Sequence, residues 1–512
     1  DETASINTTA NTLEVTGVSS ISNEYILHLD RVIWTGTTDS DWGTITNWTS
    51  GTVPVSTDHI TIPDVTNKPL LDADRSVGNV YIETNSSISL GTSTLSVVNS
   101  WNNNGTLISG TGTISFNSTD IQTIEGTNDY MNLTINNTSG GVTVSSGQQT
   151  ISGTLTLTNG LFTTNDSLLL SSTSTGTARV AEITGGSISG DVTCERYLPS
   201  SNQAGWRILG SPISGVTLAA WNDDFLTSGF TGSNDPSFSW ISLYSYNETI
   251  AGDADAEGWE APTAITDPIN VGEGYEAYIH NVDTTIDVTG TLNTGDISLN
   301  VSYTNSGSAT DDGWTLVANP YMSTIDWDDA DWVKTKMNNA VFIWDHINGV
   351  NASYVGGVSN NGGGPLIASS QGFAVQANDV SPVLTAKEGV KSSTDHTFWR
   401  KEAINVLRLE LEGAGYRDQT TIAFNTNASI AFEEDKDARK FNNMFPAPNF
   451  VSTNGTDDFS INSLSFDEDM VIPLKTLINT SGVYSINVVD ISDSINCVML
   501  YDRYLDVSIN LS

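Results

Sequence analysis

Short alternations of apolar and polar residues fill the chain between residues 77 and 190, and Gly, Asn or Ser separates each from the next. β-branched residues and Gly occupy the positions at which a helix would need its apolar stripe. This pattern predicts a right-handed parallel β-solenoid with about 20 residues per turn. A β-sandwich remains the alternative, because both folds alternate with period two. The alternations are 80–82, 87–90, 94–97, 105–108, 112–116, 133–136, 142–144 and 153–157.

A tryptophan-rich stretch, residues 31–76, precedes this region. Trp34, Trp42 and Trp48 lie among polar residues and need burial. We expect them to cap the open end of the solenoid. Before them, alternation at 12–16 and 25–29 predicts two strands within residues 1–30, from a preceding module or a cap.

Residues 191–400 contain an internal duplication. The stretch 205–212 (GWRILGSP) returns as 313–321 (GWTLVANPY). In each copy an aromatic strand follows, at 242–246 and 341–345, and then a strand opened by glycine, at 274–279 and 372–377. The tryptophans are expected to be core, and each proline to end a strand, because it cannot donate to the ladder. This region is predicted to be a duplicated β-sandwich.

One segment of the second copy, residues 328–338, has helical features. Acids stand at its start and lysines near its end, as the helix dipole favours. It is the single place where the pattern predicts a helix.

Residues 401–512 alternate again, at evenly spaced positions with turn residues between them. This spacing predicts a compact antiparallel β-sandwich. The predicted fold is therefore all-β, with a Trp-rich cap, a parallel β-solenoid, a duplicated β-sandwich region and a C-terminal β-sandwich. The strands expected last are 406–411, 420–424, 458–462, 471–474, 482–488, 498–502 and 505–507.

Charge restricts the partners of this chain. Of its 512 residues 60 are acidic and 19 basic, which gives a formal net charge of −41. Such a balance repels nucleic acids and anionic membranes, and no run of about 20 apolar residues predicts membrane insertion. The two cysteines, Cys194 and Cys497, have no metal-ligand spacing and do not form a disulfide framework. Because the chain starts at Asp1 without a signal peptide, we interpret it as a processed or excised part of a longer secreted protein.

Carboxylates in two loops are candidate ligands for Ca²⁺, a cation that prefers oxygen. Neither loop has the EF-hand spacing, and solvated acidic loops or a helix start are the alternative explanation. The candidates are Asp253 and Asp255 in one loop, and Asp326, Asp328, Asp329 and Asp331 in the other.

Catalytic motifs are not recognisable in the sequence. The five histidines lack HExxH or paired metal spacing, and no nucleophile elbow, P-loop or dinucleotide fingerprint is present. Acids, Arg and Lys are scarce at 77–178, where a solenoid lyase or glycosidase would carry them. Tyr81, Trp101 and Tyr130 are candidates for stacking on sugar rings, with core packing as the alternative.

The two Gly-Trp motifs, together with 325–327, 370–373 and several stretches of the last region, resemble the C-terminal part of large Bacteroidetes surface proteins exported by type IX secretion. The resemblance covers residues 31–512 and includes the Trp-rich start. It implies an extracellular, cell-surface location and contact with the type IX secretion machinery. The family normally ends in a further β-domain that serves as the sorting signal, and nothing after Leu505 supplies it. The stretches of the last region are 408–411, 428–432, 437–440, 472–474 and 498–502.

In that lineage O-glycans attach to Asp-Ser/Thr followed by an aliphatic residue or Thr, which matches Ser167, Thr284 and Ser494. The resemblance and the composition together favour a non-enzymatic module of a large cell-surface adhesin or filament that binds cells, glycans, proteins or surfaces. A homo-oligomer is compatible with this hypothesis. The alternatives are a part of a secreted polysaccharide-degrading enzyme and a spacer for another effector domain.

Overall fold

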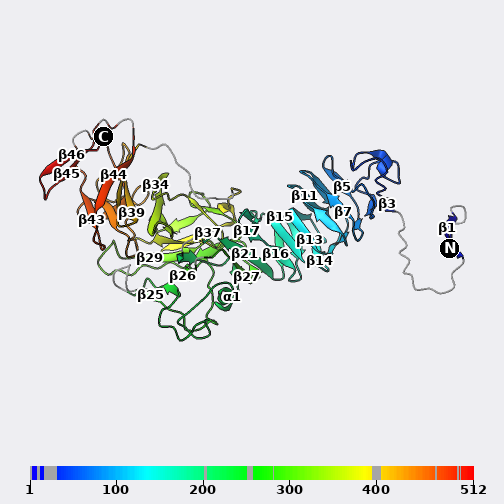
Figure 1. The fold of residues 1–512 in the computed structure, drawn as a ribbon, viewed down its shortest axis with the longest axis horizontal. Helices are drawn as coiled ribbons and strands as arrows, with labels where there is room; N and C mark the ends of the chain where they lie inside the picture. Colours follow the sequence, from blue (N-terminus) through cyan, green and yellow to red (C-terminus); the bar gives the residue numbers. More distant parts are fainter. Residues whose placement is uncertain are drawn as a thin grey trace.

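The computed structural model is nearly all β, with 47% of residues in strands and 2% in helices. It describes residues 3–7, 12–16, 31–200, 204–250, 258–280, 282–394, 405–467, 470–492, 495 and 497–511. From residue 31 onward the molecule is elongated, with a solenoid at one end and the duplicated and C-terminal regions at the other (Figure 1). In the described part of the chain no helix has the length and apolar character needed to span a membrane.

The N-terminal strands β1 (Thr3–Asn7) and β2 (Thr12–Thr16) pair antiparallel. The strand predicted at 12–16 is therefore confirmed, whereas the one predicted at 25–29 lies outside the described residues.

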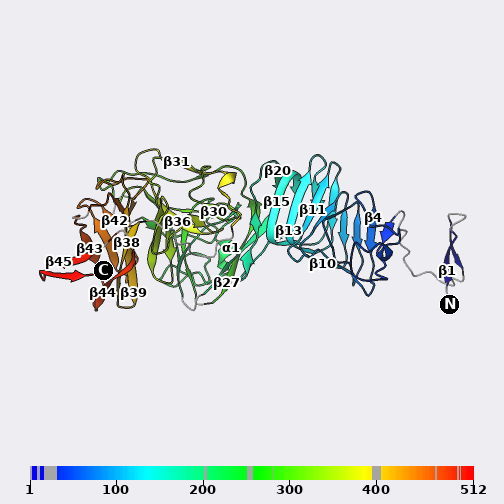
Figure 2. The ribbon, with the colours of Figure 1, turned by 90° about the horizontal axis from the view of Figure 1, so that it is seen from above.

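The middle of the chain is a parallel β-solenoid of about six turns, so the sandwich alternative is wrong. Figure 2 shows its strands stacked side by side. Two long walls of strands form the solenoid, and a shorter third side holds only the parallel pair β7 (Ser87–Ser89) and β10 (Thr106–Ile108). The first wall is β3 (Arg31–Ile33), β4 (His59–Ile62), β6 (Val80–Ile82), β9 (Trp101–Asn103), β12 (Gln122–Glu125), β14 (Val142–Val144), the end of β15 (Gln149–Thr163) and β20 (Gly186–Ser189). The second is β5 (Arg75–Val77), β8 (Thr94–Val97), β11 (Thr113–Ser118), β13 (Asn128–Asn137), the start of β15, β16 (Leu168–Leu170) and β19 (Arg179–Val180).

The alternation works as expected in the second wall. Leu95, Ile114, Leu133 and Leu155 lie in register on four successive strands, and all are fully buried. The residues beside them are Ser, Thr or, before Leu133, Asn132, and they point outward, because successive side chains of a strand face opposite sides. Each turn therefore adds an aliphatic layer to a continuous core.

The three tryptophans cap this core, as predicted. Trp34, Trp42 and Trp48 are at most 3% exposed, and their ring centroids lie 4.6–6.5 Å apart. The indole of Trp48 donates to the carbonyl of Trp42 at 2.9 Å. Strands β3 and β4 already belong to the first wall, so the solenoid begins within the segment assigned to the cap.

The duplication is confirmed by two sheets with the same strand order. Repeat 1 (residues 205–279) orders its strands β22-β26-β24-β25, and repeat 2 (residues 313–377) orders them β29-β36-β32-β33-β34. The strands of repeat 1 are β22 (Gly205–Leu209), β24 (Leu243–Tyr246), β25 (Trp259–Glu260) and β26 (Tyr275–Ile279). Those of repeat 2 are β29 (Trp314–Ala318), β32 (Val341–Asp345), β33 (Val350–Val355), β34 (Val358–Asn360) and β36 (Gly372–Gln376).

The two repeats contact each other through equivalent backbone groups. The amide of Gly210 donates to the carbonyl of Ser370 at 3.0 Å, and the equivalent amide, Ala318, donates to Gly272 at 2.9 Å. Gly210 itself faces Ala318, since a Cβ on Gly210 would lie 2.1 Å from the Ala318 Cβ. Reciprocal contacts of this kind define a local pseudo-twofold axis at the Gly210–Ala318 pair.

The solenoid continues into the repeats without a linker. Strand β21 (Val192–Leu198) pairs parallel with β16 and antiparallel with β27 (Thr284–Leu292), which extends repeat 1. Glu388 forms a second link: it accepts hydrogen bonds from the amides of Ile183 (3.0 Å) and Gly295 (2.7 Å) and from the buried ammonium of Lys391 (2.6 Å).

The C-terminal region is one seven-stranded sheet and a separate hairpin of β45 (Met499–Asp502) and β46 (Val507–Asn510). Most predicted strands are present, but β39 and β42 pair parallel, which departs from the purely antiparallel expectation. The reason is that the chain passes through β40 (Ala438–Arg439) and β41 between them. The sheet order is β43 (Leu474–Leu477), β41 (Asn449–Thr453), β42 (Asp458–Leu464), β39 (Tyr416–Phe424), β38 (Val406–Gly413) and β44 (Tyr484–Ile491).

The helix predicted at 328–338 is wrong. The segment holds a turn and strand β31 (Val333–Thr335), which pairs with β37 (Val383–Ala386). Lys334 places its ammonium 3.7 Å from the ring centroid of buried Trp327 and donates to the Trp327 carbonyl at 2.8 Å. Pairing across the fold and this buried contact outweigh the weak local helix preference.

Candidate functional site

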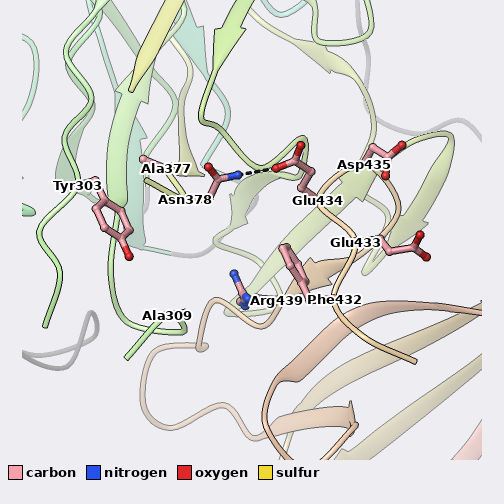
Figure 3. Close-up of a pocket in the computed structure, with 9 residues that line it drawn as sticks. All are labelled: Tyr303, Ala309, Ala377, Asn378, Phe432, Glu433, Glu434, Asp435 and Arg439. Carbon is pink, nitrogen blue, oxygen red and sulfur yellow. Dashed lines mark hydrogen bonds between the residues drawn. The ribbon is translucent and has the colours of Figure 1, made fainter. Parts of the chain in front are cut away.

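A recess of about 500 Å³ lies where repeat 2 meets the C-terminal region. Pockets of this size at the junction of two units are typical ligand sites. Figure 3 shows Tyr303 on one side, Asn378 and Glu434 joined above, and Phe432 and Arg439 below. Its lining residues are Tyr303, Ala309, Ala377, Asn378, Phe432, Glu433, Glu434, Asp435 and Arg439.

Arg439 is the fixed cation of the recess. Its guanidinium lies 3.7 Å from the Phe432 ring centroid, and its Nε donates to Asp457 at 2.8 Å. Opposite it, the amide of Asn378 donates to the Glu434 carboxylate at 2.7 Å. The lining residues thus include two aromatic rings (Tyr303 and Phe432), one guanidinium and three acids, a set suited to binding a polar group.

A second candidate is an exposed aromatic cluster on repeat 1, which we call the ring face: Trp206, Trp240, Tyr244 and Tyr278. Their ring centroids are separated by 4.7–5.9 Å in tilted or edge-to-face contacts. Trp240 is 40% exposed, and the other three are partly exposed. The sequence led us to expect Trp206 in the core, so this residue departs from the prediction.

The equivalent surface of repeat 2 is covered. Trp314 and Phe342, which correspond to Trp206 and Tyr244, are 2% exposed. Phe441 of the C-terminal region packs on both, with its ring centroid 4.6 Å from Trp314 and 6.2 Å from Phe342. The same strand arrangement therefore carries a buried ring cluster in one copy and an exposed one in the other.

The predicted sugar-stacking residues of the solenoid do not form a platform. Trp101 and Tyr130 are at most 1% exposed, so neither offers a ring face to a ligand, and core packing is the correct alternative. Trp101 donates to the Asn128 side chain at 2.8 Å, and the hydroxyl of Tyr130 donates to Gln149 at 3.0 Å. Tyr81 is partly exposed, with the Arg31 guanidinium 5.2 Å from its ring centroid.

Two of the four predicted calcium ligands in repeat 2 are local backbone acceptors, and a third, Asp328, accepts the hydroxyl of Tyr354. Asp326 accepts the amide of Asp328 at 3.0 Å, and Asp329 accepts the amide of Asp331 at 2.8 Å. Burial is the main cause that raises the pKa of Asp326. Within the described ranges, no group of three or more His, Cys, Asp or Glu side chains gathers around a common point. Asp253 and Asp255 lie outside those ranges, and Ca²⁺ binding stays a prediction.

The predicted O-glycan sites have different surroundings. Ser167 is partly exposed in a turn and stays a prediction. Thr284 is 8% exposed in β27, which argues against its modification in the folded protein. Ser494 lies outside the described residues. Both cysteines are free thiols: Cys194 is buried and Cys497 exposed, and burial raises the pKa of the Cys194 thiol.

Sequence reasoning missed both candidate sites. The recess joins residues 303–309 to 432–439, and no local motif connects these segments. The ring face had a signal, since Tyr244 and Tyr246 alternate on β24, Tyr278 lies on the adjacent β26, and Trp206 lies on β22 at the other edge of β26. That signal indicates an aromatic sheet face but not whether another element covers it.

The fold defines a β-solenoid protein with a duplicated β-sheet head and a C-terminal sheet. More specifically, the chain belongs to a family described as a domain of unknown function (DUF8693), whose model matches residues 113–512. The matched segment runs from within the solenoid to the last residue. No curated protein and no solved structure matches the chain.

Proposed function

We propose that the chain is a non-enzymatic extracellular module of a large cell-surface adhesin that attaches to cells, glycans or surfaces. One observation carries the proposal: a single hydrophobic core runs from Trp34 in the cap through the solenoid to Met322 at the junction of the repeats. A solenoid with such a core transmits force along its axis, because every turn is hydrogen-bonded to its neighbours. The proposal includes the cell-surface location and type IX export that the sequence resemblance implies.

Support also comes from where the candidate sites lie. The recess and the ring face are both in the head, beyond the end of the solenoid. They lie at one end of the elongated molecule, and the tryptophan cap lies at the other (Figure 1). The net charge of −41 favours partners other than nucleic acids and anionic membranes.

The test measures adhesion of the whole chain to immobilised cells and glycans. We expect the whole chain to bind without releasing reducing or unsaturated sugar ends. Sugar release that a single Asp or Glu substitution abolishes would instead favour the polysaccharide-degrading alternative. Absence of any binding would favour a spacer.

A further inference from the structure

The four rings of the ring face stay at least partly exposed, whereas Phe441 packs over the equivalent rings of repeat 2. Trp240 packs 5.4 Å from Trp206 and 4.7 Å from Tyr278. Like Phe441 on Trp314, it packs on the Gly-Trp tryptophan of its repeat, yet 40% of its surface stays accessible. His280 extends the face, with its ring 5.8 Å from Tyr278. By contrast, the three tryptophans of the cap make similar ring contacts and are buried.

A buried carboxyl lies beneath the rings. Glu276 pairs across the strands with Tyr244 and Ile208, and it alternates with Tyr278 on β26, so it occupies the same side of the sheet. It is 5% exposed, and within the described part of the chain its Oε1 has no hydrogen-bond partner. Buried carboxyl oxygens normally have partners, so this atom needs an explanation. The equivalent residue in repeat 2 is Ala374.

Charge indicates which ligands fit. Arg207 follows Trp206 but faces the opposite side of the sheet, where its guanidinium donates to the carbonyl of Pro199 at 2.8 Å. The ring face therefore lacks this cation as a partner for a carboxylate or sulfate, and the protein as a whole is strongly anionic. A neutral ligand with an apolar face and hydroxyl groups matches the rings and the carboxyl together.

We infer that the ring face is a binding site for a neutral carbohydrate, with the C–H face of a pyranose ring stacked on Trp240 and Trp206. The hydroxyl groups of the sugar hydrogen-bond to His280 and to the carboxyl of Glu276, which lies on the same side of the sheet. This site rests on the proposed function, because it supplies the adhesin with a glycan-recognising surface.

The test measures binding of neutral hexasaccharides (β-1,4-glucan, α-1,4-glucan, β-1,3-glucan and β-1,4-mannan) to the whole chain by calorimetry and tryptophan fluorescence. We expect saturable binding to at least one of them, and a dissociation constant at least tenfold higher for Trp240→Ala. Trp240→Tyr should retain most of the affinity, because it keeps a ring. Tyr504→Ala is the matched control: Tyr504 is 94% exposed on the distant C-terminal hairpin, and its removal should change nothing.

Trp240 lies at the surface, so Trp240→Ala should fold, and its melting curve checks this. Absence of binding to all four oligosaccharides, or binding that Trp240→Ala leaves unchanged, would overturn the carbohydrate site. Cell attachment that Trp240→Ala abolishes without any oligosaccharide binding would mean a protein ligand and also overturn it. Oligosaccharide binding without attachment to any cell or surface would leave the site standing and refute the adhesin.

Discussion

Repeats 1 and 2 share their strand order and meet through reciprocal hydrogen bonds, but their aromatic faces differ. Trp314 is buried beneath Phe441, whereas Trp206 shares a partly exposed cluster with Trp240. At the position of Ala374 in repeat 2, repeat 1 places Glu276. After duplication, one copy has thus become a support for the C-terminal region and the other presents its face. The comparison shows that a repeated motif does not imply a repeated role.

The largest loss of stability is expected at the contact between repeat 2 and the C-terminal region that covers it. The Asp418 carboxylate accepts hydrogen bonds from the buried Lys440 (2.7 Å), from Asn361 of repeat 2 (2.8 Å) and from the Phe450 amide (2.6 Å). Asp418→Asn leaves the ammonium of Lys440 buried without its counter-charge, which costs about 3–5 kcal/mol. Urea unfolding should show this loss. Asp458→Asn is the control, since its partner Lys475 is exposed and the pair contributes at most about 1 kcal/mol. Equal effects of the two variants would contradict the prediction.

The difference between Glu276 and Ala374 should appear as a pH dependence of stability. Burial raises the pKa of Glu276 to about 8 in the folded protein, above its value in the unfolded chain. Between these two pKa values the folded state holds more protons, so the free energy of unfolding falls as pH rises from about 4.5 to 8. Glu276→Gln removes this titration. As pH rises from 4.5 to 8.5, the free energy of unfolding of the variant should increase relative to that of wild type by on the order of a few kcal/mol. Urea unfolding at each pH measures this difference. A constant difference across this range would refute it.

Removing the cover should make repeat 2 resemble repeat 1. Phe441→Ala takes a partly buried ring off Trp314 and should cost about 2–3 kcal/mol. Tryptophan emission should shift to longer wavelength as Trp314 becomes solvated. Phe445→Ala provides the control, because Phe445 is 75% exposed. An unchanged emission spectrum would show that Phe441 is not the cover.

At the contact between the repeats, the methyl group of Ala318 can be moved to the equivalent position in repeat 1, Gly210. Gly210→Ala places a Cβ 2.1 Å from that of Ala318 and should cost about 1–3 kcal/mol through overpacking. Adding Ala318→Gly should restore most of the stability, because the double variant moves the methyl group to the other side. Gly364→Ala, where a Cβ meets no atom within 4 Å, is the control. Additive losses in the double variant would disprove the reciprocal packing.

The smallest effect concerns Ca²⁺. Repeat 2 carries Asp326, Asp328, Asp329 and Asp331, and repeat 1 has Asp223 and Asp224 after Trp221. Binding to the folded state would raise the melting temperature, with a gain of about 1 kcal/mol when the ion concentration is a few times Kd. Melting curves in chelator and in millimolar Ca²⁺ should differ for wild type and coincide for Asp329→Asn. Superimposable wild-type melting curves would refute Ca²⁺ binding by this loop.

The sequence by itself determined the alternating strands of the solenoid region, the tryptophan cap and the duplication, and the structure decided for a solenoid over a sandwich. In the solenoid each turn repeats the same burial, so alternation at Leu95, Ile114 and Leu133 is a local signal of a local structure. The three cap tryptophans needed burial, and the nearest apolar surface was the open end of the same ladder. The two Gly-Trp motifs predicted two similar sheets, and the strands of the two repeats do pair in the same order.

Only the tertiary structure decided the exposure of Trp206 and Trp314, the strand at 333–335 and the junction recess. Exposure depends on what a distant element covers, and Phe441 reaches Trp314 but not Trp206. Lys334 stays extended because β37 and the Trp327 ring hold it, which a helical preference of a few tenths of a kcal/mol per residue does not overcome. Alternation reports which side of a strand a residue faces, whereas contacts between remote segments determine whether that side meets protein or water.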